Sequence, residues 1–175
     1  MNPTTTPIQQ IRDGLRTFGE RYGYDTSYME RLLDAAPNAY ERFAAAMAMS
    51  QPGEALSREA GAVAAVTVLR GDDCGPCLQL TLRMAVEAGV DRKLLETALD
   101  HPERLPAPLR DIHELARQVV AGENGDLERI ARLEASLGKQ AFGELAVAIT
   151  GARIYPTLKR ALGEARSCHR ASLDF

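Results

Sequence analysis

With 175 residues, the chain is long enough to form one domain that buries a substantial core. Apolar residues make up 45% of it but aromatic residues only 5%, with no Trp, so Ala, Leu and Val supply a core that favours close-packed helices. The formal net charge is -3, from 21 basic and 24 acidic residues spread along the chain, which leaves no basic stripe of the kind that binds nucleic acid. The polar start carries no targeting pattern and no apolar run is long enough for a bilayer, so we expect a cytoplasmic protein with no membrane partner.

Apolar residues recur at helical spacing along most of the chain. The pattern predicts helices near residues 8–22, 28–35, 38–49, 58–69, 74–89, 91–99, 108–120, 126–137 and 139–162. Good N-caps are Ser57, Asp91 and Asp126. We therefore expect an all-α fold of about nine helices in one domain, residues 8–163, between a disordered tail at 1–7 and a flexible C-terminal tail at 164–175.

The most informative motif is Cys74-Gly75-Pro76-Cys77, a pair of thiols at the start of the central helix. Unpaired N–H groups at a helix start favour a thiolate, whereas the preceding Asp72 and Asp73 disfavour one. Three interpretations fit: a redox-active dithiol, an inert pair of buried thiols, or a metal site. A metal site would need Cys168 and His169 as further ligands, and a single CxxC is weak evidence for zinc, so we expect no metal and no other cofactor.

The same tetrapeptide occurs in thioredoxins, but this chain has neither a Trp nor a strand pattern after the motif. A longer stretch, residues 56–85, resembles the core of the AhpD-like, carboxymuconolactone decarboxylase family, in which a helix, a glycine turn, CxxC and a second helix follow one another. Weaker similarity lies on both sides, in residues 37–43, 137–138 and 146–155. The resemblance implies an AhpD-like helical domain that assembles as a trimer or hexamer, so we expect a homo-oligomer.

Several positions depart from the pattern of the family's active peroxidases. A Glu before the first Cys and a His after the second feed protons to the reactive thiol in that family, whereas this chain has Ala62 and Thr81 there, and Pro76 between the cysteines. The resemblance implies that Cys77 attacks and Cys74 resolves, although Cys74, nearer the helix end, is an alternative attacking thiol. Thr81 follows Cys77 by one helical turn and could hydrogen-bond its sulfur, but it cannot act as a base.

Two hypotheses of different class follow. The first is a CxxC thiol–disulfide oxidoreductase or weak alkylhydroperoxidase-like antioxidant protein, in which Cys77 and Cys74 act on a peroxide or disulfide substrate and a reducing partner protein regenerates them. The second is a non-enzymatic oligomeric redox-sensing or scaffold protein that keeps the fold without the Glu/His proton relay. The family's lactone-decarboxylase branch needs no dithiol, so the CxxC argues against it. The sequence leaves open whether the protein is an enzyme.

Overall fold

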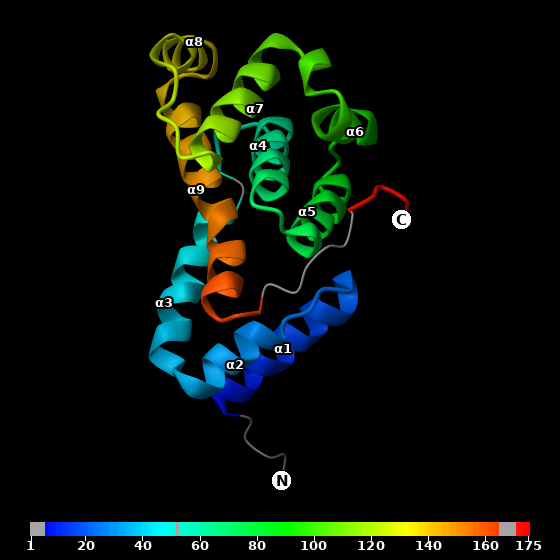
Figure 1. The fold of residues 1–175 in the computed structure, drawn as a ribbon. Helices are drawn as coiled ribbons and strands as arrows, with labels where there is room; N and C mark the ends of the chain where they lie inside the picture. The colour runs from blue at the N-terminus through cyan, green and yellow to red at the C-terminus, as the bar shows by residue number, and fades with distance from the viewer. Residues whose placement is uncertain (1–5, 52, 165–170) are drawn as a thin grey trace. The chain divides into compact units, whose positions relative to one another are not determined.

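The computed structural model describes residues 6–51, 53–164 and 171–175, which form helices and no strand. Nine α-helices make up most of the described chain, so the predicted all-α fold of about nine helices is confirmed (Figure 1). Their bounds are α1 Pro7–Tyr22, α2 Ser27–Ala35, α3 Pro37–Met47, α4 Arg58–Gly71, α5 Gly75–Glu87, α6 Arg92–Asp100, α7 Ala107–Val120, α8 Leu127–Leu137 and α9 Lys139–Ala161. Two short 3-10 helices are η1 Ala48–Ser50 and η2 Pro102–Arg104. None of the described helices combines the length and the apolar character needed to cross a membrane.

Local side-chain signals set several of the helix starts. The predicted N-caps accept hydrogen bonds from backbone N–H groups just inside their helices: Ser57 from Ala60, Asp91 from Lys93 and Asp126 from Arg129. The third helix ends at Met47, earlier than the predicted residue 49, and the chain continues as η1. There the Ser50 hydroxyl donates a hydrogen bond of 2.8 Å to the Met47 carbonyl, which favours the tighter turn.

The chain divides into two compact units, Met1–Ala46 and Met47–Phe175. In the first unit α1 packs against α2, and an ion pair joins Arg16 of α1 to Glu30 of α2 with Nε and Oε2 3.4 Å apart.

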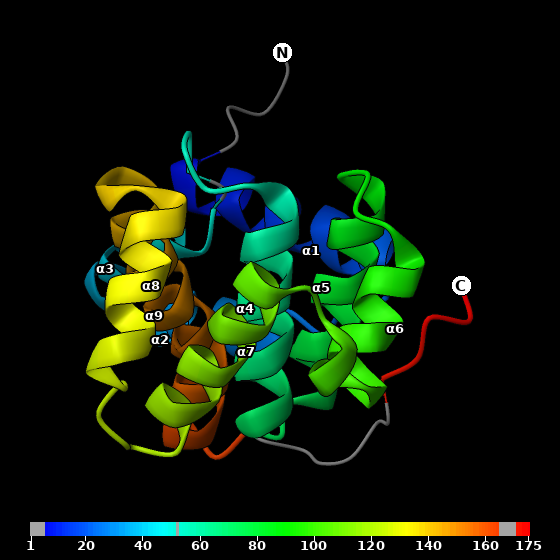
Figure 2. The same cartoon turned by 90° about the horizontal axis from the view of Figure 1, so that it is seen from above.

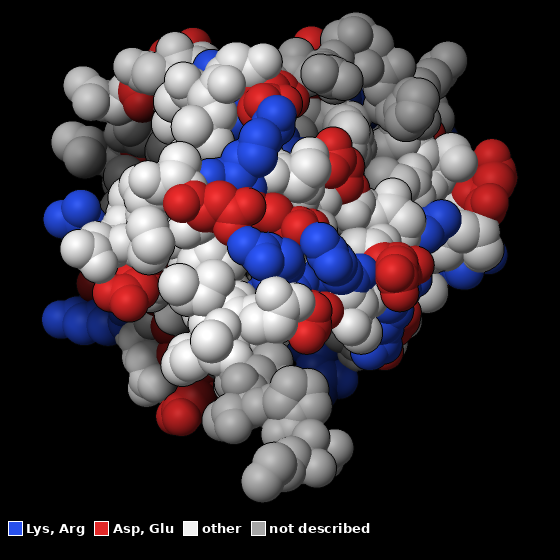
Figure 3. Space-filling model, turned by 90° about the horizontal axis from the view of Figure 1, so that it is seen from below, with Lys and Arg blue, Asp and Glu red and all other residues white. Residues whose placement is uncertain are grey.

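On the face drawn in Figure 3, acidic and basic side chains lie interspersed with uncharged ones. That face therefore carries no continuous patch of one sign.

Helix α4 lies at the centre of the second unit, where α5, α6, α7 and α9 all pack against it (Figure 2). Its side chains Val63, Ala64, Val66 and Val68 are all 0% exposed. Such small side chains let the surrounding helices approach α4 closely. The CxxC motif follows α4 directly in the chain, so this buried helix sets the position of the candidate site.

Candidate functional site

The turn between α4 and α5 is held by side chains from α9. Asp72, the C-cap of α4, is 7% exposed, and its Oδ2 lies 3.3 Å from Arg153 Nε. Arg160 Nη1 lies 3.7 Å from Asp72 Oδ1, and the same guanidinium donates to the main-chain oxygen of Asp72. Asp73 then adopts a φ of 49°, the left-handed region that aspartate tolerates better than most non-glycine residues. This anchored turn fixes where Cys74 begins the next helix.

The two cysteines lie in the first turn of α5. Cys74 is the N-cap residue and Cys77 lies inside the helix, with Gly75 and Pro76 between them. A proline is tolerated here because the first N–H groups of a helix have no intrahelical partner. Cys74 and Cys77 are joined as a disulfide, with Cα atoms 5.3 Å apart. The side chains are 8% and 4% exposed, so solvent reaches only a small part of either.

A cavity of about 470 Å³ lies beside the disulfide. Its walls come from the end of α4, the turn, the start of α5, α6, and residues 171–174. Cys74 lines this cavity, whereas Cys77 is not among the described residues that line it. A molecule in the cavity would therefore meet the Cys74 side of the disulfide first.

The cavity wall carries charges of both signs, with carboxylates in excess. Its acidic residues are Asp73, Glu96, Asp100 and Asp174. Arg70 supplies the only guanidinium among the described lining residues. These carboxylates disfavour a thiolate at Cys74, while the N–H groups at the start of α5 favour one. The sequence placed Asp72 in the same acidic group, but its carboxylate is paired with α9 and its charge is compensated there.

The two positions where the AhpD-like pattern has its proton-relay Glu and His, residues 62 and 81 here, lie on the two helices that flank the turn. Ala62, where the AhpD-like pattern has Glu, is on α4 and 9% exposed. Thr81, where the pattern has His, is half-buried on α5, one turn after Cys77. Neither side chain exchanges a proton near neutral pH. The hydrogen bond expected between Thr81 and Cys77 stays a prediction.

The described histidines do not line the cavity. His113 of α7 is half-buried, and its pKa is lowered because burial disfavours the imidazolium form. His101 is exposed, with Nδ1 3.6 Å from Glu103 Oε1. Within the part of the chain that the structure describes, no group of three or more His, Cys, Asp or Glu could hold a metal ion. Cys168 and His169, the further ligands considered for a metal site, lie outside the described residues.

Residues 171–175 contribute to the site, although the sequence predicts them as part of a flexible tail. Their backbone is held by Gln79 of α5 and Arg92 of α6, and four of them line the cavity. Nothing in the predicted site includes these residues. The one local signal was a pair of apolar residues, Leu173 and Phe175, in an otherwise polar stretch.

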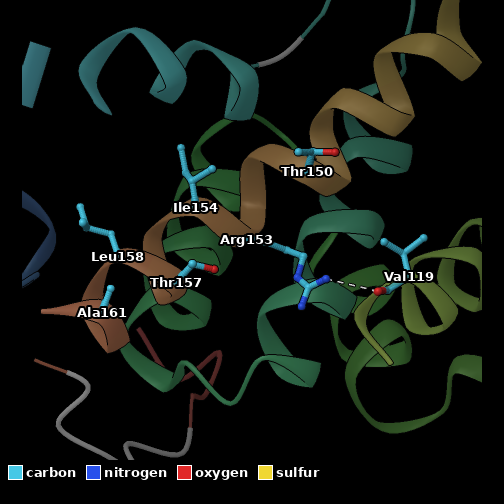
Figure 4. A pocket seen from close by; sticks show the side chains of 7 residues that line it. All are labelled: Val119, Thr150, Arg153, Ile154, Thr157, Leu158 and Ala161. Atoms are coloured by element: carbon cyan, nitrogen blue, oxygen red, sulfur yellow. Dashed lines mark hydrogen bonds between the residues drawn. The ribbon is translucent and has the colours of Figure 1, made fainter. Parts of the chain in front are cut away.

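A second cavity, of about 560 Å³, lies along α9 (Figure 4). Its lining includes the apolar side chains of Ile154 and Leu158, and Arg153 donates a hydrogen bond of 3.2 Å to the Val119 carbonyl at its edge. The described residues that line it include no cysteine or histidine. Unlike the cavity at Cys74, it has no thiol, imidazole or carboxylate among its described lining residues, so the chemistry of the described chain points to Cys74.

Comparison with known proteins assigns no family to the chain. The resemblance to the AhpD-like family therefore depends on the residues quoted above, and above all on the CxxC motif with its flanking helices. The chain matches no family model, no curated protein and no solved structure.

Proposed function

We propose that the protein is a thiol–disulfide oxidoreductase that cycles Cys74 and Cys77 between the disulfide and dithiol forms. The observation that carries the proposal is that Cys74 and Cys77 are joined at the start of α5 while Cys74 alone of the two lines a cavity. Sulfur chemistry of this kind needs no metal or organic cofactor. A cytoplasmic location, which the composition predicts, would supply thiol reductants.

The reductive half of the cycle begins at Cys74. A thiolate of a reducing partner protein attacks Cys74 Sγ, the Cys74–Cys77 bond breaks, and Cys77 leaves as a thiolate among the N–H groups of the first turn of α5. A second thiolate of the partner then attacks the partner sulfur of the mixed disulfide and releases Cys74. Two electrons pass from the partner, which becomes a disulfide, to the dithiol of this protein.

The oxidative half has two possible substrates. With a disulfide, the thiolate of Cys77 or Cys74 attacks one sulfur of the substrate, and the substrate's other sulfur leaves as a thiolate. The other cysteine of the pair then attacks the resulting mixed disulfide, which forms the Cys74–Cys77 bond and releases the remaining substrate sulfur as a thiolate. With a hydroperoxide, the Cys77 thiolate takes the terminal oxygen and an alcohol leaves, after which Cys74 attacks the sulfenic acid and water leaves. Without an acid or base at Ala62 and Thr81, the peroxide route loses about 10²–10⁴ in rate, which favours disulfide exchange.

The first experiment is a titration of the protein against defined thiol–disulfide buffers, followed by alkylation of the free thiols. We expect one reversible two-electron transition near the cytosolic potential, and loss of exchange activity in Cys74→Ser and in Cys77→Ser. Cys168→Ser is the matched control and should titrate like the unchanged protein. Full exchange activity in both Ser variants, or thiols that do not reoxidise to the intramolecular disulfide, would exclude the proposal.

The second candidate is a non-enzymatic redox-sensing or scaffold protein. It is favoured by the low exposure of the two cysteines, 8% and 4%, and by Ala62 and Thr81 at the relay positions. The double variant Ala62→Glu with Thr81→His separates the candidates for the peroxide reaction. A large gain of peroxidase activity would mean that the natural site is not a competent peroxidase.

Assembly is a separate part of the proposal. The resemblance to the AhpD-like family implies a homo-oligomer, a trimer or a hexamer. Light scattering coupled to size-exclusion chromatography, on the full chain, gives the mass directly. A mass of one 19.0 kDa chain at micromolar concentration would contradict the expectation.

A further inference from the structure

Residues 171–175 lie against α5 and α6, at the end drawn in red in Figure 1, and turn near their end, where the Phe175 N–H donates to the Leu173 carbonyl at 3.0 Å. The carboxamide of Gln79 recognises the backbone of Ser172 in both directions. Gln79 Nε2 donates to the Ser172 carbonyl at 2.9 Å, and the Ser172 N–H donates to Gln79 Oε1 at 2.8 Å. This arrangement satisfies both backbone polar groups of residue 172 and places no demand on its side chain.

Two arginines contact the end of the segment. Arg92 donates from Nη1 to the Leu173 carbonyl at 2.7 Å and from Nη2 to the main-chain oxygen of Phe175 at 2.9 Å. The guanidinium carbons of Arg92 and Arg83 lie 4.9 Å and 5.3 Å from the centre of the Phe175 ring. Cations at this distance from an aromatic ring attract it. The helices thus offer backbone recognition followed by a site for an aromatic side chain.

The bound segment also lines the cavity beside the disulfide. Ala171, Ser172, Leu173 and Asp174 line the same cavity as Cys74. Cys74 is only 8% exposed with the segment in place. A reagent that attacks Cys74 Sγ must share this space with the segment or replace it.

We propose that the surface formed by α5 and α6 beside Cys74 is a binding site for a short peptide, that residues 171–175 are its resident ligand in the same chain, and that their release opens Cys74 to thiols. The peptide site stands on its own contacts, whereas its control of Cys74 rests on the proposed function. A reducing partner protein would reach Cys74 by placing a segment that contains its cysteine where residues 171–175 lie.

The site is tested by removing the resident ligand. A chain that ends at residue 170, kept in the disulfide form, should bind a fluorescent peptide Ala-Ser-Leu-Asp-Phe saturably in an anisotropy titration. The full chain should bind it more weakly, because the resident segment competes at high effective concentration. Arg92→Ala in the shortened chain should weaken binding about tenfold, and so should replacing the peptide's Phe by Ala. Lys93→Ala, an exposed position on the same helix, is the matched control and should bind like the shortened chain.

The consequence for the disulfide is measured separately, as the rate of its reduction by excess dithiothreitol. The shortened chain and full-length Gln79→Ala should be reduced about three- to tenfold faster than the full chain. In the first the segment is absent, and in the second it leaves its site more often, so Cys74 is open to the reagent for more of the time. Adding the free peptide should slow the shortened chain again. Circular dichroism confirms that each variant is folded.

These outcomes separate the peptide site from the redox activity. Saturable peptide binding in a protein without reversible redox chemistry would overturn the proposed function and leave the peptide site standing. No saturable binding up to millimolar peptide, together with equal reduction rates for the full and shortened chains, would overturn the peptide site. Binding with unchanged reduction rates would overturn the control of Cys74.

Discussion

Two neighbouring aspartates in the turn before the CxxC motif have different environments. Asp72 is buried and faces Arg153 and Arg160, whereas Asp73 is exposed and lines the cavity at Cys74. A buried carboxylate depends on its cations, because it has exchanged water for them. Asp73 is exposed, so its carboxylate is accessible to solvent. The two positions therefore form a natural pair for a substitution experiment.

Asp72→Asn keeps the size of the side chain and removes its charge. We expect the free energy of unfolding to fall by about 1–2 kcal/mol, less than for a fully buried pair, because Arg153 and Arg160 are 37% and 47% exposed. Asp73→Asn is the control, since asparagine tolerates the left-handed conformation equally well, and it should change stability little. Urea denaturation of both variants measures the difference. Equal stability of the two would mean that the α9 arginines do not anchor the turn.

The lowered pKa of His113 predicts how the free energy of unfolding depends on pH. Burial lowers its pKa below the ordinary 6.5; Arg117 and Arg70 lower it too, and Glu114 opposes them. The unfolded chain therefore takes up the proton first as pH falls, so this group's contribution to stability is lost from about pH 6.5 downward to the lowered pKa of the folded state. In His113→Gln this decrease of the free energy of unfolding with falling pH should disappear. Urea titrations between pH 7.5 and about 5 test this; identical slopes in both proteins would show that His113 contributes nothing.

At the scale of helices, one carboxylate of α9 holds the loop that leads into α4. Glu144 accepts hydrogen bonds from the backbone N–H groups of Ala55 and Leu56 at 2.9 Å and 2.7 Å. These bonds, with the one from Leu56 as the largest cause, lower the pKa of Glu144. A helix in one part of the chain thus orders the loop before the central helix of the site.

Glu144→Gln should weaken this arrangement, because a neutral amide oxygen accepts from N–H groups less strongly than a carboxylate. Since the pKa of Glu144 is lowered in the folded state, its contribution is present above the ordinary 4.5 and is lost as pH falls through the lowered value. We therefore expect the variant to be less stable at pH 7 and closer to the unchanged protein in strong acid. Thermal unfolding at both pH values measures it, with Glu134→Gln as control. A stability gap that stays constant with pH would exclude the carboxylate as its cause.

The elements differ in how far the sequence alone predicts them. Helix starts such as Ser57 and Asp126 could be predicted, because an N-cap acts on N–H groups within the next few residues. The disulfide partners could be predicted for the same reason, since their spacing is local. The pairing of Asp72 with Arg160 and the contact of Gln79 with Ser172 could not, because they join residues 88 and 93 positions apart. Such contacts follow from tertiary packing, which local patterns do not encode.

At the scale of the whole molecule, the candidate site belongs to one of the two compact units. Its cysteines, its cavity, the anchoring arginines and the segment 171–175 all fall within Met47–Phe175. The central helix α4 of this unit packs against α5, α6, α7 and α9, which all belong to the same unit. A unit that contains its own central helix and its own neighbours can bury a core without help from elsewhere in the chain.

We therefore expect residues 47–175, expressed alone, to fold as a helical domain and to keep the site. Circular dichroism should give a cooperative thermal transition, and dithiothreitol should reduce the Cys74–Cys77 disulfide at a rate within about twofold of that in the full chain, because the cavity is complete in this fragment. The same fragment with Val66→Asp, a charge in the core of α4, is the negative control and should not fold. A fragment with helical content but no cooperative transition, and with exposed apolar surface that binds a hydrophobic dye, would show that residues 1–46 are needed to complete the core.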